Sequence, residues 1–149
     1  MDLYTDEYFM KEALREAAIA LDLGEVPVGA VVVCNNRIIG RGDNQTEKLT
    51  DATAHAEMIA ITAAESFLGS KYLRDCTLYV TLEPCTMCVG AMHWVQLGKL
   101  VYGARDVQRG YSLLKGTVLH PKTEVVQGTL QKACEELIVT FFQRVREKH

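Results

Sequence analysis

Three residues, His55, Cys85 and Cys88, have the types and the spacing of metal ligands. Cys85 and Cys88 stand three residues apart in a Pro-Cys-X-X-Cys motif, so on a helix their thiols share one face and can bind one ion. His55 supplies a third ligand, and zinc favours such a mixed set of sulfur and nitrogen. Because three protein ligands leave the fourth tetrahedral position open to water, the motif predicts one catalytic zinc ion per chain.

Glu57 follows His55 by two residues and is the expected proton carrier. Positions two apart on a helix point about 200° away from each other, so the two side chains converge only over the helix end, with His55 in the first turn. Cys85 also begins a predicted helix, so two positive helix ends face the metal and lower the pKa of the thiols and of a water bound there. Glu57 would take a proton from that water and deliver it to a leaving nitrogen.

The sequence pattern of the first part of the chain predicts a helix followed by a β-hairpin. Thr5 caps a helix that runs to about residue 23, where Gly24 ends it. The apolar run 28–34 and the segment 37–41 are joined by an Asn-Asn turn, which is typical of a hairpin.

The rest of the chain alternates between helical and extended patterns, which indicates an α/β fold. We expect a three-layer α/β/α sandwich around a mixed five-stranded sheet, because the hairpin excludes a wholly parallel sheet. Nothing in the composition marks a linker, so residues 1–149 are expected to form a single domain. The further helices are predicted over 54–65, 86–97 and 130–146, and the further strands over 76–82, 99–104 and 123–126.

Composition excludes several classes of protein. Hydrophobic residues make up 48% of the chain and charged residues 23%, which rules out a disordered or collagen-like chain. No apolar stretch is long enough to span a bilayer, and no signal peptide is visible. Five cysteines argue against a complete disulfide framework because the number is odd. We therefore expect a reduced, cytoplasmic protein that does not enter a membrane.

The net charge of −3 conceals an asymmetry along the chain. Residues 1–98 carry 7 Lys and Arg against 14 Asp and Glu, whereas residues 99–149 carry 9 against 5. The phosphates of a bound polyanion should therefore lie against the last third. Ordinary solvated faces explain the same distribution, and charge alone favours that interpretation over polyanion binding.

The motifs resemble a known family. His-Ala-Glu at 55–57 and Pro-Cys-Thr-Met-Cys at 84–88 form the H-x-E and P-C-x-x-C signature of the zinc-dependent cytidine/nucleobase deaminases. The chain is most similar to the bacterial tRNA adenosine deaminases within that superfamily. The likeness covers nearly the whole chain and is carried by the segments 25–30, 51–57, 81–92 and 103–106 and by the double Phe at 141–142.

The resemblance implies a cytidine-deaminase-like fold and the hydrolytic conversion of adenosine to inosine at the wobble position of a tRNA anticodon. It also implies a homodimer in which the partner chain borders each active site, with the tRNA anticodon stem-loop as the bound partner. Substrate contacts carry over position by position. Asn44 would hydrogen-bond the target nucleoside, Val28 would line its pocket, the Ala56 amide would meet the base, Asp106 would shape the anticodon channel, and Phe142 and Arg144 would contact flanking RNA.

Two other functions remain open. A deaminase of a free nucleobase, guanine or cytosine, would share every zinc-site residue but would need neither the basic last third nor Phe142 and Arg144. A noncatalytic zinc-binding subunit is the other alternative, and Glu57 argues against it because a structural zinc site needs no additional carboxylate.

Overall fold

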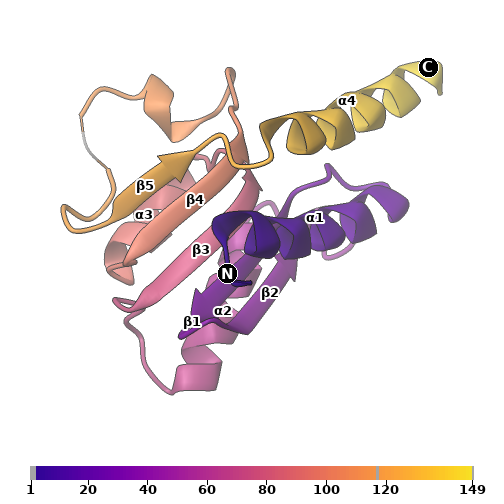
Figure 1. Ribbon diagram of the computed structural model, residues 1–149. Coiled ribbons are helices and arrows are strands. Elements are labelled where there is room, and N and C mark those ends of the chain that lie inside the picture. The colour runs from indigo at the N-terminus through magenta and orange to yellow at the C-terminus, as the bar shows by residue number, and fades with distance from the viewer. Residues whose placement is uncertain (1–2, 117, 149) are drawn as a thin grey trace.

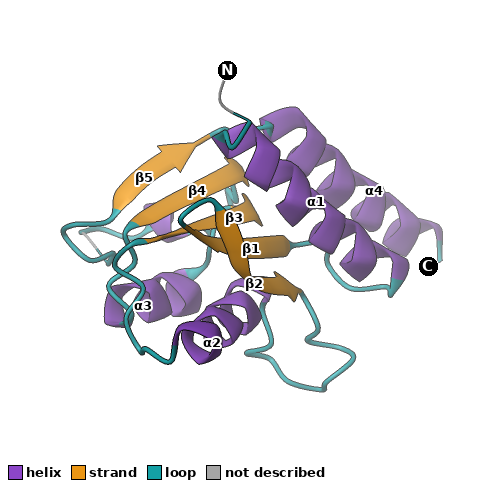
Figure 2. Ribbon diagram, turned by 60° about the horizontal axis from the view of Figure 1, so that its bottom comes forward, coloured by secondary structure: helices purple, strands orange, loops and turns teal. Residues whose placement is uncertain are grey.

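The computed structural model describes residues 3–116 and 118–148, and it has three layers (Figures 1 and 2). Helices α1 (Asp6–Asp22) and α4 (Gln131–Glu147) cover one face of a β-sheet. Helices α2 (Ala56–Leu68) and α3 (Thr86–Trp94) cover the opposite face. None of the described helices is long and apolar enough to cross a membrane.

The sheet has five strands in the order β2-β1-β3-β4-β5. β1 pairs antiparallel with both β2 and β3, whereas β3, β4 and β5 are parallel to one another. The predicted mixed five-stranded sheet within a three-layer sandwich is therefore confirmed. The strands are β1 (Gly29–Cys34), β2 (Arg37–Asp43), β3 (Cys76–Leu82), β4 (Lys99–Ala104) and β5 (Glu124–Gln127).

The central strands β1, β3 and β4 are mostly apolar and buried because helices cover both of their faces. In β1, Val32 packs in the core shared with α2 and α3, whereas its neighbours Val31 and Val33 pack in the core on the α1 side. Successive strand residues point to opposite faces, so a continuous Val run supplies both cores.

Glycines let the helices lie directly against the sheet. A Cβ on Gly29 would overlap the backbone of α1 at the Ala13 carbonyl, and a Cβ on Gly42 would overlap the Ala56 carbonyl in the first turn of α2. The absence of side chains at these positions therefore fixes how closely both helices approach the strands. For α2 this contact positions the helix end that carries the predicted active-site residues.

Three helix boundaries differ from the sequence prediction: the start of α2, its end at Leu68 rather than 65, and the end of α3. α2 begins at Ala56 rather than residue 54, because the Asp51 carboxylate accepts hydrogen bonds from both the backbone N–H and the hydroxyl of Thr53 and holds a turn there. α3 ends at Trp94 rather than 97, because the chain reverses at Gln96, whose φ is 55°, before entering β4. A short 3-10 helix at Tyr111–Leu113 was not predicted. The predicted ends of the other elements lie within two residues of the observed ones.

Candidate functional site

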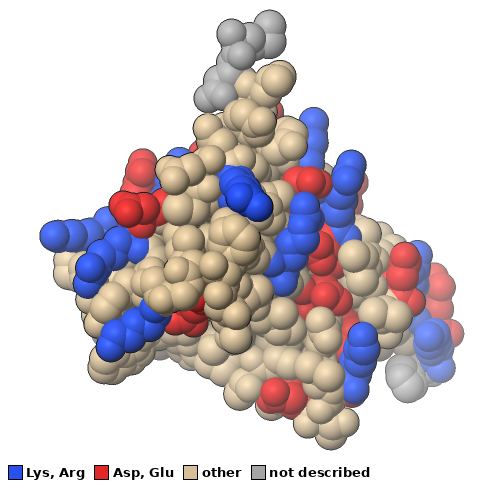
Figure 3. All heavy atoms as spheres, turned by 90° about the horizontal axis from the view of Figure 1, so that it is seen from below, with Lys and Arg blue, Asp and Glu red and all other residues tan. Residues whose placement is uncertain are grey.

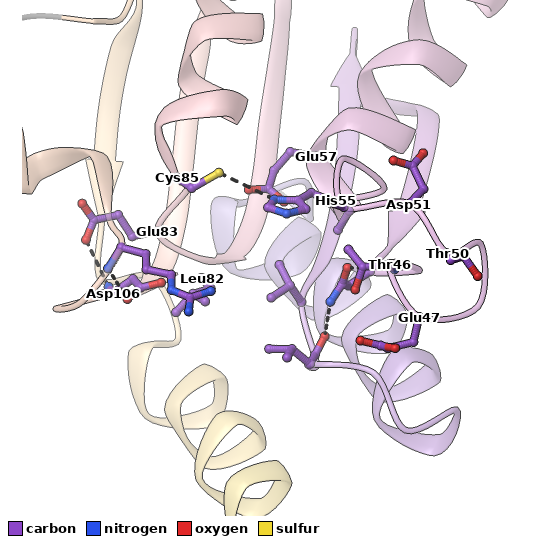
Figure 4. Close-up of a pocket in the computed structure, with 16 residues that line it drawn as sticks. Thr46, Glu47, Thr50, Asp51, His55, Glu57, Leu82, Glu83, Cys85 and Asp106 are labelled. Carbon is purple, nitrogen blue, oxygen red and sulfur yellow. Dashed lines mark hydrogen bonds between the residues drawn. The ribbon is translucent and has the colours of Figure 1, made fainter.

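A cavity of about 610 Å³ lies where the N-termini of α2 and α3 meet the ends of the strands. Leu82 at the end of β3 lines it (Figure 4), as do Val28 before β1 and Asn44 after β2. Its volume is in the range of small-molecule sites. Of the ten residues predicted from sequence, seven line the cavity: Val28, Asn44, His55, Ala56, Glu57, Cys85 and Asp106.

His55, Cys85 and Cys88 form a compact triangle of ligand atoms. His55 Nδ1 lies 3.6 Å from Cys85 Sγ and 3.5 Å from Cys88 Sγ, and the two sulfurs are 3.8 Å apart. A tetrahedral zinc with ordinary bond lengths places two sulfurs about 3.8 Å apart and a sulfur and a nitrogen about 3.6 Å apart. The donor set therefore fits zinc in geometry as well as in chemistry, and these three are the one such group among the described residues.

Two of the three ligands lie one step before their helices. His55 and Cys85 are the N-cap residues of α2 and α3, with extended backbone angles, and neither side chain caps its helix. The expectation that His55 lies in the first turn is therefore wrong, because the turn at 51–53 delays the helix until Ala56. The extended N-cap conformation leaves these ligand side chains free to meet over the positive helix ends.

The cluster favours a thiolate. A hydrogen bond from Cys88, together with His55, lowers the pKa of Cys85 to about 3. The pKa of Cys88 is raised, because its thiol bonds the Cys85 sulfur and is buried. The pKa of His55 is raised by its hydrogen bond with Cys85. A thiolate held ready in this way is the form of cysteine that binds a metal.

Glu57 is buried beside the triangle without belonging to it. Its side chain is 4% exposed and lines the same cavity as His55 and Cys85 (Figure 4). Burial raises the pKa of this carboxyl group to about 7. A carboxyl group that is not a ligand and faces an open metal position has the placement of a general acid/base.

Two further buried carboxylates hold the walls of the cavity. Glu25 is 2% exposed and accepts the backbone N–H groups of Glu47 and Lys48 at 3.0 and 2.8 Å. Glu83 is also 2% exposed and accepts the N–H groups of Asp106 and Ser112 at 3.1 and 3.0 Å. Sequence reasoning gave neither residue a role; their only signal was that Glu25 and Glu83 fall inside segments that carry the family resemblance.

Asn44 is already engaged in the structure. It is 8% exposed, its Nδ2 donates to the Val26 carbonyl, and its Oδ1 accepts the Thr46 N–H. One N–H of the side-chain amide remains for a ligand in the cavity.

Phe142 and Arg144 lie apart from the cavity. Both are exposed on α4, and neither is part of the cavity lining. Their contact with RNA stays a prediction. Cys88, the tenth predicted residue, is fully buried behind the lining, where its sulfur completes the triangle.

The sequence and the fold both match known deaminases. The model of the cytidine and deoxycytidylate deaminase zinc-binding region matches residues 3–104. The tRNA-specific adenosine deaminase of Bacillus subtilis (strain 168) is 44% identical over 148 residues, which cover 96% of this chain and 92% of that protein.

Two solved structures share the fold. One, from a study of A-to-I editing by tRNA:A34 deaminases at the wobble position of transfer RNA, has a TM-score of 0.82 and 39% identity, covering 87% of this chain and 98% of that one. A guanine deaminase from Bacillus subtilis has a TM-score of 0.64 and 39% identity, covering 70% of this chain and 66% of that one. The chain therefore belongs to the zinc-binding cytidine and deoxycytidylate deaminase family, and tRNA-specific adenosine deaminases are its relatives over nearly the full length.

Proposed function

We propose that this chain hydrolyses adenosine to inosine at the wobble position of a tRNA anticodon. The observation that carries the proposal is the buried carboxyl group of Glu57, which shares a cavity with a three-ligand metal triangle. Similarity to a tRNA-specific adenosine deaminase over 96% of the chain supports adenosine in tRNA as the substrate.

The reaction replaces the amino group at C6 of adenine by oxygen, so that adenosine and water give inosine and ammonia. Zinc held by His55 Nδ1 and the sulfurs of Cys85 and Cys88 would supply a water acidic enough to attack at neutral pH. Glu57 would take a proton from the water on one carboxylate oxygen and return it to the departing nitrogen. Because Glu57 is buried beside the metal ligands, its carboxyl group lies close to both proton donor and proton acceptor.

The remaining cavity residues suit a purine nucleoside turned out of its loop. Asn44 offers an amide N–H, Val28 an apolar wall, and the Ala56 amide a donor at the start of α2. Asp106 borders the cavity on its other side. Extruding a base from its stack costs a few kcal/mol, so contacts to flanking nucleotides must offset that cost.

α4 is the proposed source of some of those contacts. Phe142 is 48% exposed and Arg144 is exposed on the same helix, of which Cys134 alone is buried among the described residues. An exposed aromatic ring can stack on a base, and an arginine can bind a phosphate. We further propose that two chains form a homodimer, with the partner bordering each active site, and that the enzyme works in the cytoplasm.

A direct test incubates zinc-loaded protein with an anticodon stem-loop that carries a wobble adenosine, and separately with guanine and with cytosine. Inosine from the stem-loop is the expected product. Xanthine or uracil without inosine would move the substrate to a free base, as in the guanine deaminase of similar fold, and leave the zinc chemistry in place. Phe142→Ala combined with Arg144→Ala should raise KM for the stem-loop and leave the zinc content unchanged.

A further inference from the structure

The loop that follows β4 forms one wall of the cavity and contributes two of its lining residues, Asp106 and Arg109. Residues 105–112 of this loop wrap around the side chain of Glu83, as Figure 4 shows for Asp106. Both carboxylate oxygens of Glu83 accept backbone N–H groups, one from each end of the loop. A Cβ on Gly110 would overlap the Glu83 carboxyl group, so the loop lies directly on this buried acid.

Asp106 continues the same network toward Arg109. Its Oδ1 accepts the backbone N–H groups of Gln108 at 3.1 Å and of Arg109 at 3.0 Å. Glu83 therefore fixes the position of Asp106, and Asp106 fixes the turn that carries Arg109 to the cavity. Each step is a hydrogen bond from a backbone N–H to a carboxyl oxygen, which is a directional contact.

The guanidinium of Arg109 is unpaired within the described residues. The residue is exposed, and its side chain forms no ion pair or hydrogen bond with any residue in the described part of the chain. Asp106 is close along the chain, but its Oδ1 is engaged by the backbone of the turn. Arg109 is thus a cation held at a binding cavity with all its side-chain donors available.

The other charges around the cavity indicate what Arg109 could bind. Glu47, Asp51 and Asp106 also line the cavity, and Arg109 is the one Lys or Arg among its described lining residues. A nucleotide whose base enters this cavity brings its own phosphates to the mouth, where the acidic lining repels them. An unpaired guanidinium binds a phosphate with two parallel hydrogen bonds, which offsets that repulsion.

We propose that Arg109 binds a backbone phosphate next to the target nucleotide, and that Glu83 is a positioning residue that holds the loop for this contact. The inference rests on the proposed activity toward RNA. It assigns a phosphodiester ligand to a residue outside the zinc chemistry.

The first test compares Arg109→Ala with Arg105→Ala, in zinc-loaded protein acting on the anticodon stem-loop. Arg105 is the matched control, because it is an exposed arginine of the same loop that does not line the cavity. Arg109→Ala should raise KM about tenfold, as expected for loss of one hydrogen-bonded charge pair, and change kcat little. It should also reduce the slope of log KM against log salt by about 0.7, the value for one phosphate contact to a single strand. Equal effects of the two variants would overturn the proposal, because they would indicate general charge attraction.

The second test locates the phosphate. Stem-loops are made with an uncharged methylphosphonate at each phosphate around the target adenosine, one at a time. At the contacted phosphate, the methylphosphonate should raise the KM of the wild type by as much as Arg109→Ala raises it on the unmodified stem-loop. It should raise the KM of Arg109→Ala little further, because the contact is already absent in that variant. Independent, additive losses at every position would contradict a contact between Arg109 and a phosphate.

Glu83→Gln tests the positioning role, because an amide cannot accept both N–H groups. We expect faster hydrogen exchange at Asp106 and Ser112, unchanged zinc content, and a rise in KM that does not add to that of Arg109→Ala. A fall in kcat with unchanged KM would assign Glu83 to something other than this contact. If Glu83→Gln does not fold, the two Arg109 tests still decide the phosphate contact. Absence of inosine with the wild type would refute the proposed function itself, whereas normal kinetics of Arg109→Ala would refute only this inference.

Discussion

At the scale of single residues, the site separates metal binding from proton transfer. His55, Cys85 and Cys88 bring their ligand atoms within 4.8 Å of one another, whereas Glu57 stays outside that group although it lines the same cavity. Loss of a ligand and loss of the proton carrier should therefore produce different defects.

Cys88→Ala should abolish zinc binding and activity together. The Cys88 sulfur contacts both other ligand atoms, so its removal leaves two ligands, too few for the tetrahedral set of a catalytic site. Zinc per chain is measured by elemental analysis alongside inosine formation. Cys76→Ala is the matched control, because this buried thiol lies in β3 outside the ligand group and should leave one zinc per chain. Full zinc in Cys88→Ala would show that the ligand set is wrong.

Glu57→Gln should keep zinc and the fold while losing turnover. The amide has the shape of the carboxyl group and preserves packing, but it cannot accept and return a proton. Removal of a positioned acid/base costs about 10² to 10⁴ in rate, and the upper end is expected because Glu57 serves both proton steps. The measurements are zinc content, thermal unfolding and kcat on the stem-loop. Turnover near that of the wild type would assign the proton transfer to another group.

The sequence predicted these residues because their types carry the chemistry. The Cys-X-X-Cys and His-X-Glu motifs predict a metal site and a general base when they lie close together, and the structure places them in one cavity. Glu25 and Glu83 could not be found in this way. Glu83 accepts hydrogen bonds from N–H groups that lie 23 and 29 residues later in the chain. Without knowledge of this long-range contact, an isolated acidic residue in a sequence cannot be distinguished from an ordinary surface charge.

At the scale of elements, the central strands were predictable because strands covered on both faces are rich in apolar residues. The start of α2 was less predictable, because the hydrogen bonds from Thr53 to the Asp51 carboxylate hold a turn at 51–53 in place of the helix. The strand order depends on pairings such as that of Cys34 with Cys76, which no local pattern encodes. The close contact between β2 and α2 could not be predicted from the sequence either, because it depends on the absence of a Cβ at Gly42.

Gly42→Ala should weaken zinc binding without touching a ligand. The new Cβ would overlap the Ala56 carbonyl and lie 2.9 Å from the Ala60 nitrogen, so α2 must shift and carry His55 and Glu57 with it. Overpacking of this kind costs about 1–3 kcal/mol of unfolding free energy. Chemical unfolding and competition with a zinc chelator measure the two effects.

Gly90→Ala is the control for this prediction. Gly90 lies within α3, and a Cβ there meets nothing within 4 Å, so alanine should stabilise the helix by about 0.5–1 kcal/mol. Gly42→Ala with the zinc affinity and stability of the wild type would contradict the proposed role of the close contact.

At the scale of the whole molecule, α4 is the helix least integrated into the core. α1 buries five residues, whereas Cys134 is the one buried residue of α4 among those described, and α4 reaches beyond the sheet (Figure 1). In the view of Figure 3, Lys and Arg side chains are interspersed with Asp and Glu and do not form a continuous basic face. An RNA bound to this face would therefore rely on individual contacts rather than on a broad positive surface.

The attachment of α4 through Cys134 should make stability fall at alkaline pH. Burial raises the pKa of this thiol to about 12, whereas a thiol in the unfolded chain has a pKa of about 8.5. Between these values the unfolded chain releases a proton that the folded chain keeps, so the contribution of Cys134 is complete below pH 8.5 and declines as the pH rises toward 12.

Cys134→Ala removes this titration and serves as the comparison. Its deficit in unfolding free energy relative to the wild type should be largest near pH 8 and shrink by at most about 1.4 kcal/mol per pH unit above pH 9. Urea unfolding of both zinc-loaded proteins at pH 8, 9 and 10 under reducing conditions measures the difference. Thiols elsewhere, including Cys76 with its pKa also raised to about 12 by burial, titrate alike in both proteins and cancel. A constant difference in unfolding free energy across this range would mean that Cys134 ionises as readily in the folded chain as in the unfolded one. The start of α4 around Cys134 would then separate from β4 in the folded chain.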